Sequence, residues 1–315
     1  MSNLVNVGVI GVGSLGQWHA KVYAACPGAR LAGVCDADPA RAREIGERYG
    51  APVYDSPAEL AEHVDAASIV VPTDKHAETA LPLIARGLHL LVEKPIAATL
   101  EESEAMMAAA ARHGTILQVG HVERFNPVMS VLEEVLHNPR FFEATRLAPF
   151  PPPRPGLTPR GTEVSVVLDL MIHDLEVILH LVRSPLKELH ACGVPVLSPS
   201  EDIANVRLLF ENGCVANITA SRVSQDKVRK IRVFQPDAYV SLDYQNQTGR
   251  IIRRENNVIV PSEVPIEKSD ALERELASFI SCVHNRHEPV VGGRHAFEAL
   301  KLAMAICRHI RAGGS

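Results

Sequence analysis

The sequence has no apolar run long enough to cross a bilayer, and it does not open on a basic segment followed by an apolar one. It also lacks an excess of basic residues. The formal net charge is −5, which excludes a general electrostatic attraction to nucleic acid. The six cysteines form no Cys-x-x-Cys pair, so we expect reduced, packed thiols rather than metal ligands or disulfides. These absences predict a cytoplasmic protein that binds neither membranes nor nucleic acid and holds no metal.

Apolar residues, in contrast, are plentiful at 46%, enough for two cores in a chain of 315 residues. Up to Gly120, short apolar runs alternate with helical patterns, which is typical of a parallel, doubly wound α/β sheet. Thr99 followed by Glu102 predicts a capping box, and Gly114 predicts the end of that helix. The predicted strands cover 4–10, 31–36, 67–71, 88–92 and 115–119, and the predicted helices cover 16–25, 39–49, 75–86 and 100–113.

The pattern changes after Gly120, where several strands follow one another without helices between them. Such a run indicates an antiparallel sheet in an α+β domain. We therefore predict a Rossmann domain over 1–121 and a substrate-binding domain over 122–315. The second part is expected to hold a helix at 125–137, a strand at 141–147, a proline-rich extended loop at 148–156, a long helix at 163–182, strands within 186–264 with turns at Asn212-Gly213 and Thr248-Gly249, and helices at 270–286 and 294–310.

The first predicted strand runs into a Gly-x-Gly-x-x-Gly turn, and Asp36 follows the third glycine by 20 residues. This arrangement is the dinucleotide-binding fingerprint, in which backbone N–H groups at a helix N-terminus hold a pyrophosphate. A carboxylate at Asp36 can accept hydrogen bonds from ribose hydroxyls and repels a 2′-phosphate, which favours NAD over NADP. Arg41 is the alternative signal, since it either meets a phosphate or is a solvated helix residue. The predicted cofactor-binding residues here are Gly11, Val12, Gly13, Ser14, Leu15 and Asp36.

Two further loops follow the carboxyl ends of predicted strands, where ligands bind in open α/β sheets. Thr73 and His76, after Val71, either line the cofactor or belong to the start of a helix. Glu93 and Lys94 end another strand, and Pro95 restricts Lys94 to extended geometry. Lys94 there either stabilises a substrate oxyanion or is a surface cation. We add Val71, Thr73, His76, Glu93 and Lys94 to the predicted cofactor-binding residues.

Asp169 and His173 are spaced i, i+4 among apolar residues in the predicted long helix. A histidine can take the proton from an alcohol during hydride removal, and the carboxylate can orient the histidine or a substrate hydroxyl. The alternatives are a buried structural pair or half of a zinc site, but no third or fourth ligand is apparent. Near the predicted domain junction, Arg124, Phe125 and Asn126 either face the ligands or tie the domains together.

Taken together, Gly11–Gly16, Val71-Pro72-Thr73, Glu93-Lys94-Pro95, Val119-Gly120-His121 and Asp169-x-x-x-His173 resemble the motifs of the Gfo/Idh/MocA family over nearly the whole chain. The resemblance implies a Rossmann domain followed by a domain with an open, mostly antiparallel sheet. It also implies that this sheet forms a homodimer or homotetramer. By the same resemblance, Lys94, Asp169 and His173 are the catalytic residues.

The segments 120–127, 146–152 and 169–175 more narrowly resemble the branch of that family that oxidises nucleotide sugars. This implies NAD-dependent oxidation of a UDP-sugar, in particular at C3 of UDP-N-acetylglucosamine, on a route to lipid A with a diamino sugar. Arginines are suited to the substrate diphosphate because guanidinium binds phosphate oxygens bidentately. Oxidation of a free polyol such as inositol, NAD-assisted glycoside hydrolysis and a non-enzymatic ligand sensor are the alternatives. The predicted substrate-binding residues are Lys94, Arg124, Phe125, Asn126, Arg154, Arg160, Asp169 and His173.

Overall fold

The computed structural model describes residues 4–153, 159, 161–255 and 258–313, which fold into two compact units. The first unit is formed by Met1–Phe125 together with Asp270–Phe297, and the second by Asn126–Ser269 together with Glu298–Ser315. This division differs from the predicted domains, 1–121 and 122–315, because a C-terminal segment returns to the first unit.

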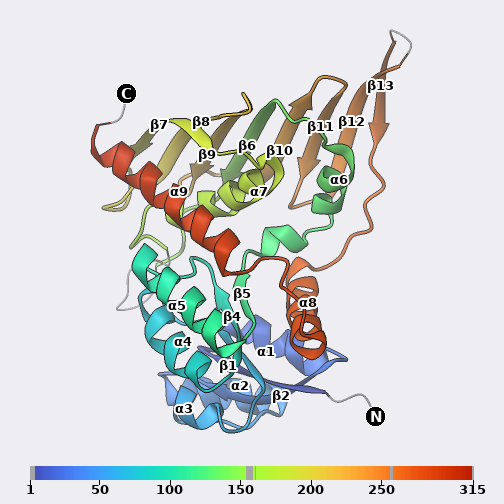
Figure 1. Ribbon diagram of the computed structural model, residues 1–315. Helices are drawn as coiled ribbons and strands as arrows, with labels where there is room; N and C mark the ends of the chain where they lie inside the picture. Colours follow the sequence, from blue (N-terminus) through green and yellow to red (C-terminus); the bar gives the residue numbers. More distant parts are fainter. Residues whose placement is uncertain (1–3, 154–158, 160, 256–257, 314–315) are drawn as a thin grey trace. The chain divides into compact units, whose positions relative to one another are not determined.

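The first unit is built on a parallel sheet with the strand order β2-β1-β3-β4-β5 (Figure 1). The predicted doubly wound sheet is confirmed, including the capping box of Thr99 and Glu102 and the left-handed Gly114 after α5. The described strands are β1 (Val5–Ile10), β2 (Ala29–Cys35), β3 (Ala66–Ile69), β4 (His89–Glu93) and β5 (Leu117–Gly120). The described helices are α1 (Gly16–Ala25), α2 (Pro39–Tyr49), α3 (Pro57–Leu60), η1 (Thr73–Lys75), α4 (His76–Ala85), α5 (Leu100–His113), η2 (Val122–Phe125) and α8 (Ala271–Asn285).

Helix α8 is far from the first unit in sequence but completes its core. Leu276 and Phe279 are fully buried in one apolar cluster with Val5 and Tyr23. The helix also contacts α1, β1 and η2. Because burial of apolar surface is the main stabilising term in folding, this face of α8 explains why 270–297 belongs to the first unit.

The second unit contains an eight-stranded sheet, in the order β13-β12-β11-β10-β6-β9-β8-β7. Adjacent strands pair antiparallel except for β6 and β9, which are parallel, so the predicted open, mostly antiparallel sheet is confirmed. The strands are β6 (Phe141–Leu147), β7 (Leu186–Val194), β8 (Ile203–Phe210), β9 (Val215–Ser221), β10 (Val228–Gln235), β11 (Ala238–Asp243), β12 (Thr248–Glu255) and β13 (Val258–Glu263). The described helices are α6 (Val128–Val135), the π-helical turn η3 (Val167–Met171), α7 (Ile172–Val182) and the part of α9 (Gly293–Arg311) that begins at Glu298.

Helices α6, α7 and α9 cover one face of this sheet (Figure 1). Alternate residues of β6, such as Phe142 and Ala144, are buried beneath them, whereas Phe141 and Glu143 face the other side and are partly exposed. This alternation is the ordinary pattern of a sheet with one covered face.

The helix predicted at 163–182 begins later than expected. Gly161 has a left-handed φ of 80°, and the helical turns start around Val167, whose N–H is accepted by the Ser165 hydroxyl. The carbonyl of Val164 accepts a hydrogen bond from Arg222 instead of a helical N–H. Tertiary hydrogen bonds therefore replace the first predicted turn.

The turn predicted at Thr248-Gly249 is also displaced, because both residues belong to β12. The chain reverses just before them, where Asp243 accepts hydrogen bonds from the N–H groups of Gln245 and Asn246. Gly249 lies opposite Leu242, and a Cβ at Gly249 would overlap the Leu242 side chain. Glycine at position 249 therefore allows β11 and β12 to pack closely. The turn at Asn212-Gly213 is confirmed, with a φ of 80° at Gly213.

The described part of the predicted proline-rich loop, 148–153, forms no helix or strand, and 154–156 lies outside the described residues. Among the residues that are described, none of the helices combines the length and apolar character needed to cross a membrane.

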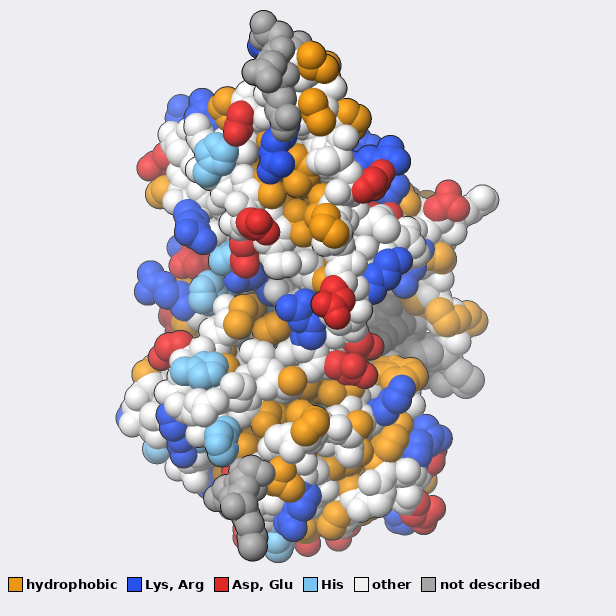
Figure 2. Space-filling model, turned by 90° about the vertical axis from the view of Figure 1, so that its right-hand side faces the viewer, with side chains coloured by type: hydrophobic (Ala, Val, Ile, Leu, Met, Phe, Trp, Pro, Cys, Tyr) orange, Lys and Arg blue, Asp and Glu red, His pale blue; other side chains and the backbone are white. Residues whose placement is uncertain are grey.

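Figure 2 shows acidic and basic side chains interspersed over the face that it presents.

Candidate active site

The glycine-rich turn after β1 depends on glycine for packing at two positions. Gly11 donates its N–H to the carbonyl of Cys35 at 2.8 Å, and its φ is 84°. A Cβ at Gly11 would lie 2.6 Å from the Val70 carbonyl oxygen, and a Cβ at Gly16 would overlap the carbonyl of Gly11. The turn therefore holds β1, β3 and α1 closer together than any side chain would allow.

Gly13 is different, because a Cβ there would meet nothing within 4 Å. Gly13 and Ser14 are exposed just before the ten-residue helix α1 begins. The open space over Gly13 and the positive end of α1 fit a pyrophosphate, which needs close approach to backbone N–H groups. The residues present thus fit a dinucleotide.

Asp36 closes the same turn from the end of β2. Its Oδ2 accepts the N–H of Val12 at 2.7 Å, and its Oδ1 accepts the N–H of Asp38 at 2.9 Å. Arg41 is not a freely solvated side chain, since its Nε donates to the Val12 carbonyl at 2.9 Å and its Nη1 to Glu44 at 2.6 Å. A cation and an anion therefore flank one backbone turn, which is the position where ribose or a 2′-phosphate is read in such folds.

We expect the Asp36→Ser substitution to shift cofactor preference from NAD toward NADP. Loss of charged hydrogen bonds to the ribose should raise the Kd for NAD by about 10–100-fold, since such bonds contribute about 1.5–3 kcal/mol. Removal of the carboxylate also leaves the Arg41 guanidinium to attract a 2′-phosphate, so the Kd for NADP should fall. Calorimetric titration of both cofactors measures the change.

Asp38→Ser is the matched control, because Asp38 caps α2 by accepting the N–H groups of Ala40 and Arg41, and serine retains that ability. The control should keep the ratio of the two dissociation constants. An Asp36→Ser protein with an unchanged ratio would refute the assigned role of Asp36.

His76 lies behind the strand ends rather than at the surface. The ring is fully buried, with Nδ1 at 2.9 Å from the Pro95 carbonyl and Nε2 at 3.0 Å from the Val71 carbonyl. Burial lowers the pKa of His76, while the two carbonyls act in the opposite direction. His76 thus joins the loop after β3 to the loop after β4, and its predicted contact with the cofactor stays a prediction. Thr73 begins η1 and remains partly exposed.

Lys94 follows β4 directly and is partly exposed, with a cis peptide bond to Pro95. Glu93 is turned inward, where its Oε1 lies 3.2 Å from His19 Nε2 and its Oε2 accepts the Lys94 N–H at 3.2 Å. Burial alone would raise the pKa of Glu93, but the hydrogen bond from His19 and the charges of His19 and Lys94 hold it below its usual range. Glu93 is therefore an anion, and its carboxylate accepts the backbone N–H of Lys94.

His121 is buried directly after β5, the strand that pairs with β4. Burial lowers the pKa of His121 to about 3, and the positive charge of Lys94 acts in the same direction. The imidazole is therefore neutral at pH 7.

Glu275 brings a second buried carboxyl to this region from α8. The side chain is fully buried, and neither oxygen has a hydrogen-bond partner among the described residues. Burial raises the pKa of Glu275 well above its usual range, and the carboxylates of Glu93 and Glu123 reinforce the shift. Folded Glu275 therefore keeps its proton to a higher pH than the unfolded chain does.

We expect Glu275→Gln to stabilise the protein progressively as the pH rises above about 4.5. In that window the unfolded wild-type chain releases a proton that folded Glu275 retains, so wild-type stability falls with rising pH. The difference in unfolding free energy, variant minus wild type, should grow by up to about 1.4 kcal/mol per pH unit. Urea unfolding at several pH values measures it.

Glu273→Gln is the control for this effect, since Glu273 is exposed on the same helix. Its stability difference should not grow with pH. A pH-independent difference for Glu275→Gln would mean that Glu275 is ionised in the folded state.

In the second unit, Asp169 lies in η3 and His173 in the first turn of α7. Both side chains are partly exposed, and the wide π-turn keeps the two residues within one helical turn. Gly161 packs against the carboxylate, because a Cβ there would lie 2.5 Å from Asp169 Oδ2. A carboxylate and an imidazole so placed can hold a hydroxyl group and accept its proton.

Three of the predicted substrate-binding residues are buried in the structure. Arg124 and Phe125 are buried at the end of the first unit. Asn126 is buried too, and its amide donates to the Tyr244 carbonyl at 3.0 Å and accepts the N–H of Val128 at 3.2 Å. Asn126 therefore holds the start of α6 against the sheet, and its predicted contact with substrate stays a prediction. The predicted residues Arg154 and Arg160 lie outside the described residues.

An ion pair beneath α7 was not predicted from the sequence. Arg146 Nε lies 2.7 Å from Asp174 Oδ2 and Nη2 lies 3.1 Å from Oδ1, with both side chains almost fully buried. A signal was present, because Arg146 continues the buried alternation of Phe142 and Ala144. The pair fastens the helix that carries His173 to β6.

The parallel sheet, the glycine turn and Asp36 define a dinucleotide-binding protein of the doubly wound class. The comparisons with known proteins specify the class further. The model of an oxidoreductase family with an NAD-binding Rossmann fold matches residues 5–121, and that of the GFO/IDH/MocA C-terminal domain matches residues 131–239. The chain belongs to the Gfo/Idh/MocA family and is an NAD-dependent oxidoreductase.

Similar proteins cover almost the full chain. UDP-N-acetylglucosamine 3-dehydrogenase of Acidithiobacillus ferrooxidans is 36% identical, with 96% of this chain and 97% of the relative aligned. A solved structure of that enzyme, GnnA, has a TM-score of 0.92 at 34% identity and covers 98% of this chain and 99% of its own. Myo-inositol 2-dehydrogenase of Thermotoga maritima is 28% identical over 96% of this chain and 95% of its own length.

Proposed function

We propose that the protein oxidises a secondary hydroxyl of a UDP-sugar, specifically C3 of UDP-N-acetylglucosamine, with NAD as the acceptor. The observation that carries this proposal is the 36% identity to UDP-N-acetylglucosamine 3-dehydrogenase along 96% of the chain. Asp36 on the glycine turn and the pair Asp169 and His173 supply the residue types that the reaction needs.

In this proposal three residues act on one substrate hydroxyl. His173 accepts the hydroxyl proton, Lys94 stabilises the developing oxyanion, and Asp169 orients the hydroxyl or the imidazole. Bound NAD supplies the hydride acceptor. The product is a 3-keto sugar, and we propose that an aminotransferase consumes it on a route to lipid A with a diamino sugar.

The test is a substrate panel with NAD and NADP. NADH should form with UDP-N-acetylglucosamine and not with inositols or glucose. Because oxidation of an alcohol by NAD is unfavourable near neutral pH, the assay includes an aminotransferase with glutamate to remove the ketone. Absence of turnover with every UDP-sugar would refute the proposal.

A free inositol is the second candidate substrate, because inositol dehydrogenases are among the full-length relatives. The scyllo-inositol 2-dehydrogenase of Bacillus subtilis is 26% identical over 99% of this chain. NADH formation with an inositol and not with UDP-sugars would favour this candidate.

We also propose a cytoplasmic homodimer or homotetramer that assembles through the uncovered face of the eight-stranded sheet. That face carries an aromatic group in which Phe234 stacks on Tyr239 at 4.6 Å between ring centroids and lies 5.7 Å from Phe141. Phe234 is 37% exposed, which suits a residue that an identical partner covers. Analytical ultracentrifugation decides the assembly state.

A further inference from the structure

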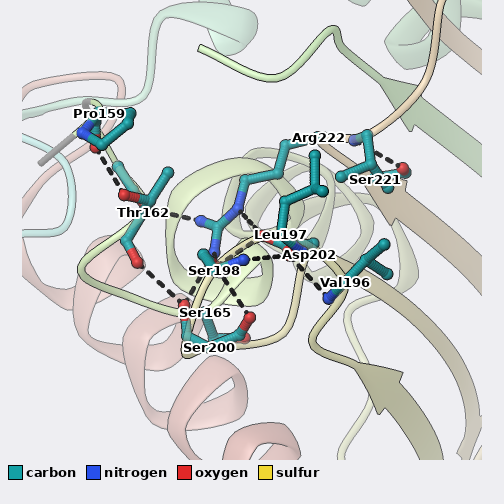
Figure 3. Close-up of polar contacts among 12 residues, drawn as sticks. Pro159, Thr162, Ser165, Val196, Leu197, Ser198, Ser200, Asp202, Ser221 and Arg222 are labelled. Atoms are coloured by element: carbon teal, nitrogen blue, oxygen red, sulfur yellow. Dashed lines mark hydrogen bonds and ion pairs between the residues drawn. The ribbon is translucent and has the colours of Figure 1, made fainter. Parts of the chain in front are cut away.

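Arg222 and Asp202 form a buried ion pair that the proposed reaction does not use (Figure 3). Arg222 Nε donates to Asp202 Oδ1 at 2.7 Å, and both side chains are almost fully buried. Burial alone would raise the pKa of Asp202, but hydrogen bonds from Ser198, Arg222 and backbone N–H groups hold it below its usual range. The pair is therefore ionised and fixed in the interior of the second unit.

The guanidinium of Arg222 reaches two separate loops. Its Nη2 donates to the hydroxyls of Ser198 at 2.9 Å and Ser200 at 2.8 Å, in the loop between β7 and β8 (Figure 3). Its Nη1 donates to the carbonyls of Gly161 at 2.5 Å and Val164 at 2.8 Å. Arg222 thus ties the segment that leads into η3 to the end of β9.

The segment 161–164 that Arg222 holds lies against the side chain of Asp169. Gly161 has a φ of 80°, and a Cβ at this position would come 2.5 Å from Asp169 Oδ2. The carboxylate therefore rests against the peptide whose carbonyl Arg222 holds. The Ser200 hydroxyl supports the same segment, at 2.8 Å from the Val164 carbonyl and 3.2 Å from that of Thr162.

We propose that Arg222, held by Asp202, is a positioning residue that sets the Asp169 carboxylate through Gly161. This inference rests on the proposed function, because it requires that Asp169 acts on the substrate. Arg222 does not touch the substrate, and its effect reaches the reaction through the 161–164 segment. A guanidinium is suited to this task because its planar set of five N–H donors can hold an anion and four further oxygens at once.

The first experiment compares Arg222→Lys with wild type, using UDP-N-acetylglucosamine and NAD. An ammonium group has three donors and cannot reach both loops and Asp202, so the segment shifts. Because a displacement of about 1 Å costs about 10²-fold in rate, kcat should fall by about that factor, while the Kd for NAD changes by less than about twofold. A wild-type kcat in Arg222→Lys would overturn the proposal.

The double variant Asp169→Asn with Arg222→Lys distinguishes an effect through Asp169 from a general loss of activity. In an Asp169→Asn background, where the carboxylate is already lost, Arg222→Lys should lower kcat by less than about threefold. An equal loss in both backgrounds would show that Arg222 does not act through Asp169. Gly161→Ala should likewise lower kcat in wild type, since its Cβ displaces the carboxylate.

Two variants guard against a loss of folding. Ser200→Ala removes one hydroxyl from the network and should give a smaller fall in kcat in the same direction. Val240→Ala removes buried apolar volume from β11, in the same core, and should lower stability without lowering kcat at a temperature where the protein is folded. A fall in kcat for Val240→Ala equal to that for Arg222→Lys would overturn the proposal.

A final measurement does not depend on the substrate. Hydrogen exchange of peptides covering Gly161–Ile172 should be faster in Arg222→Lys than in wild type, and exchange in β11 should be unchanged. If the wild-type protein turns over no UDP-sugar, the proposed function fails and the exchange result alone tests the positioning role. Unchanged exchange in this segment would overturn it.

Discussion

Replacing His173 with alanine or Lys94 with methionine is expected to lower kcat about 10²–10⁴-fold with UDP-N-acetylglucosamine. His173→Ala removes the group that accepts the hydroxyl proton, and Lys94→Met removes the cation that stabilises the oxyanion. The Kd for NAD should change by less than about threefold, because most of the predicted cofactor contacts lie on the glycine turn and Asp36. Steady-state kinetics and NAD titration measure the two effects separately.

His180→Ala is the matched control on the same helix, since His180 bonds to Glu133 at 2.8 Å near the end of α7. It should retain kcat within about twofold. If both His173→Ala and Lys94→Met turn over at the wild-type rate, the assigned roles are refuted. If NAD binding is lost in either variant, that residue acts in cofactor binding.

Breaking the buried Arg146–Asp174 pair is expected to cost more stability than any surface change. Asp174→Ala leaves the Arg146 guanidinium buried without its anion, which costs about 3–5 kcal/mol in comparable pairs. The double variant Arg146→Met with Asp174→Leu should recover most of this loss, because no uncompensated charge remains. Urea unfolding measures all three proteins.

The same strand offers a control on its opposite face. Glu143 pairs with Arg232 at 2.8 Å, and both side chains are more than 40% exposed. Glu143→Ala should therefore cost less than about 1 kcal/mol. A loss for Asp174→Ala no larger than that for Glu143→Ala would mean that the buried pair contributes no more than a surface pair.

The nucleotide half of the candidate site follows from local sequence. The turn Gly11–Gly16 needs only its own residues and the neighbouring strand ends, so a strand, three glycines and a spaced acid are enough to predict it. The burial of His76 could not be predicted in the same way. Its position after β3 is visible in the sequence, but the Pro95 carbonyl that binds its ring comes from a different strand end.

The sequence contains a signal for the buried ion pairs, because alternate residues of a strand face the same side of the sheet. Asp202 precedes the inward series Ala204 and Val206, and Arg222 follows the inward residue Ala220. Because Ile203 pairs with Ser221 in antiparallel strands, Asp202 lies opposite Arg222, one residue beyond that pair. The sequence shows that each faces inward, but their meeting depends on the register of strands β8 and β9.

The return of α8 to the first unit could not be predicted from its own residues. Leu272, Leu276, Phe279 and Val283 predict an apolar helix face. That pattern does not say which core the face will join, because both units offer apolar surfaces. The contacts with α1 settle the question only in the folded chain.

The discontinuous first unit has a consequence for the order in which the chain folds during synthesis. The ribosome makes residues 126–269 before Phe279, which is fully buried against the N-terminal core. Domains generally fold as units while the chain is being made, but here the first unit lacks part of its core until residues 126–269 of the second have been synthesised. Nascent chains that end before Asp270 leave the α1 face uncovered, and exposed apolar surface of this kind favours aggregation.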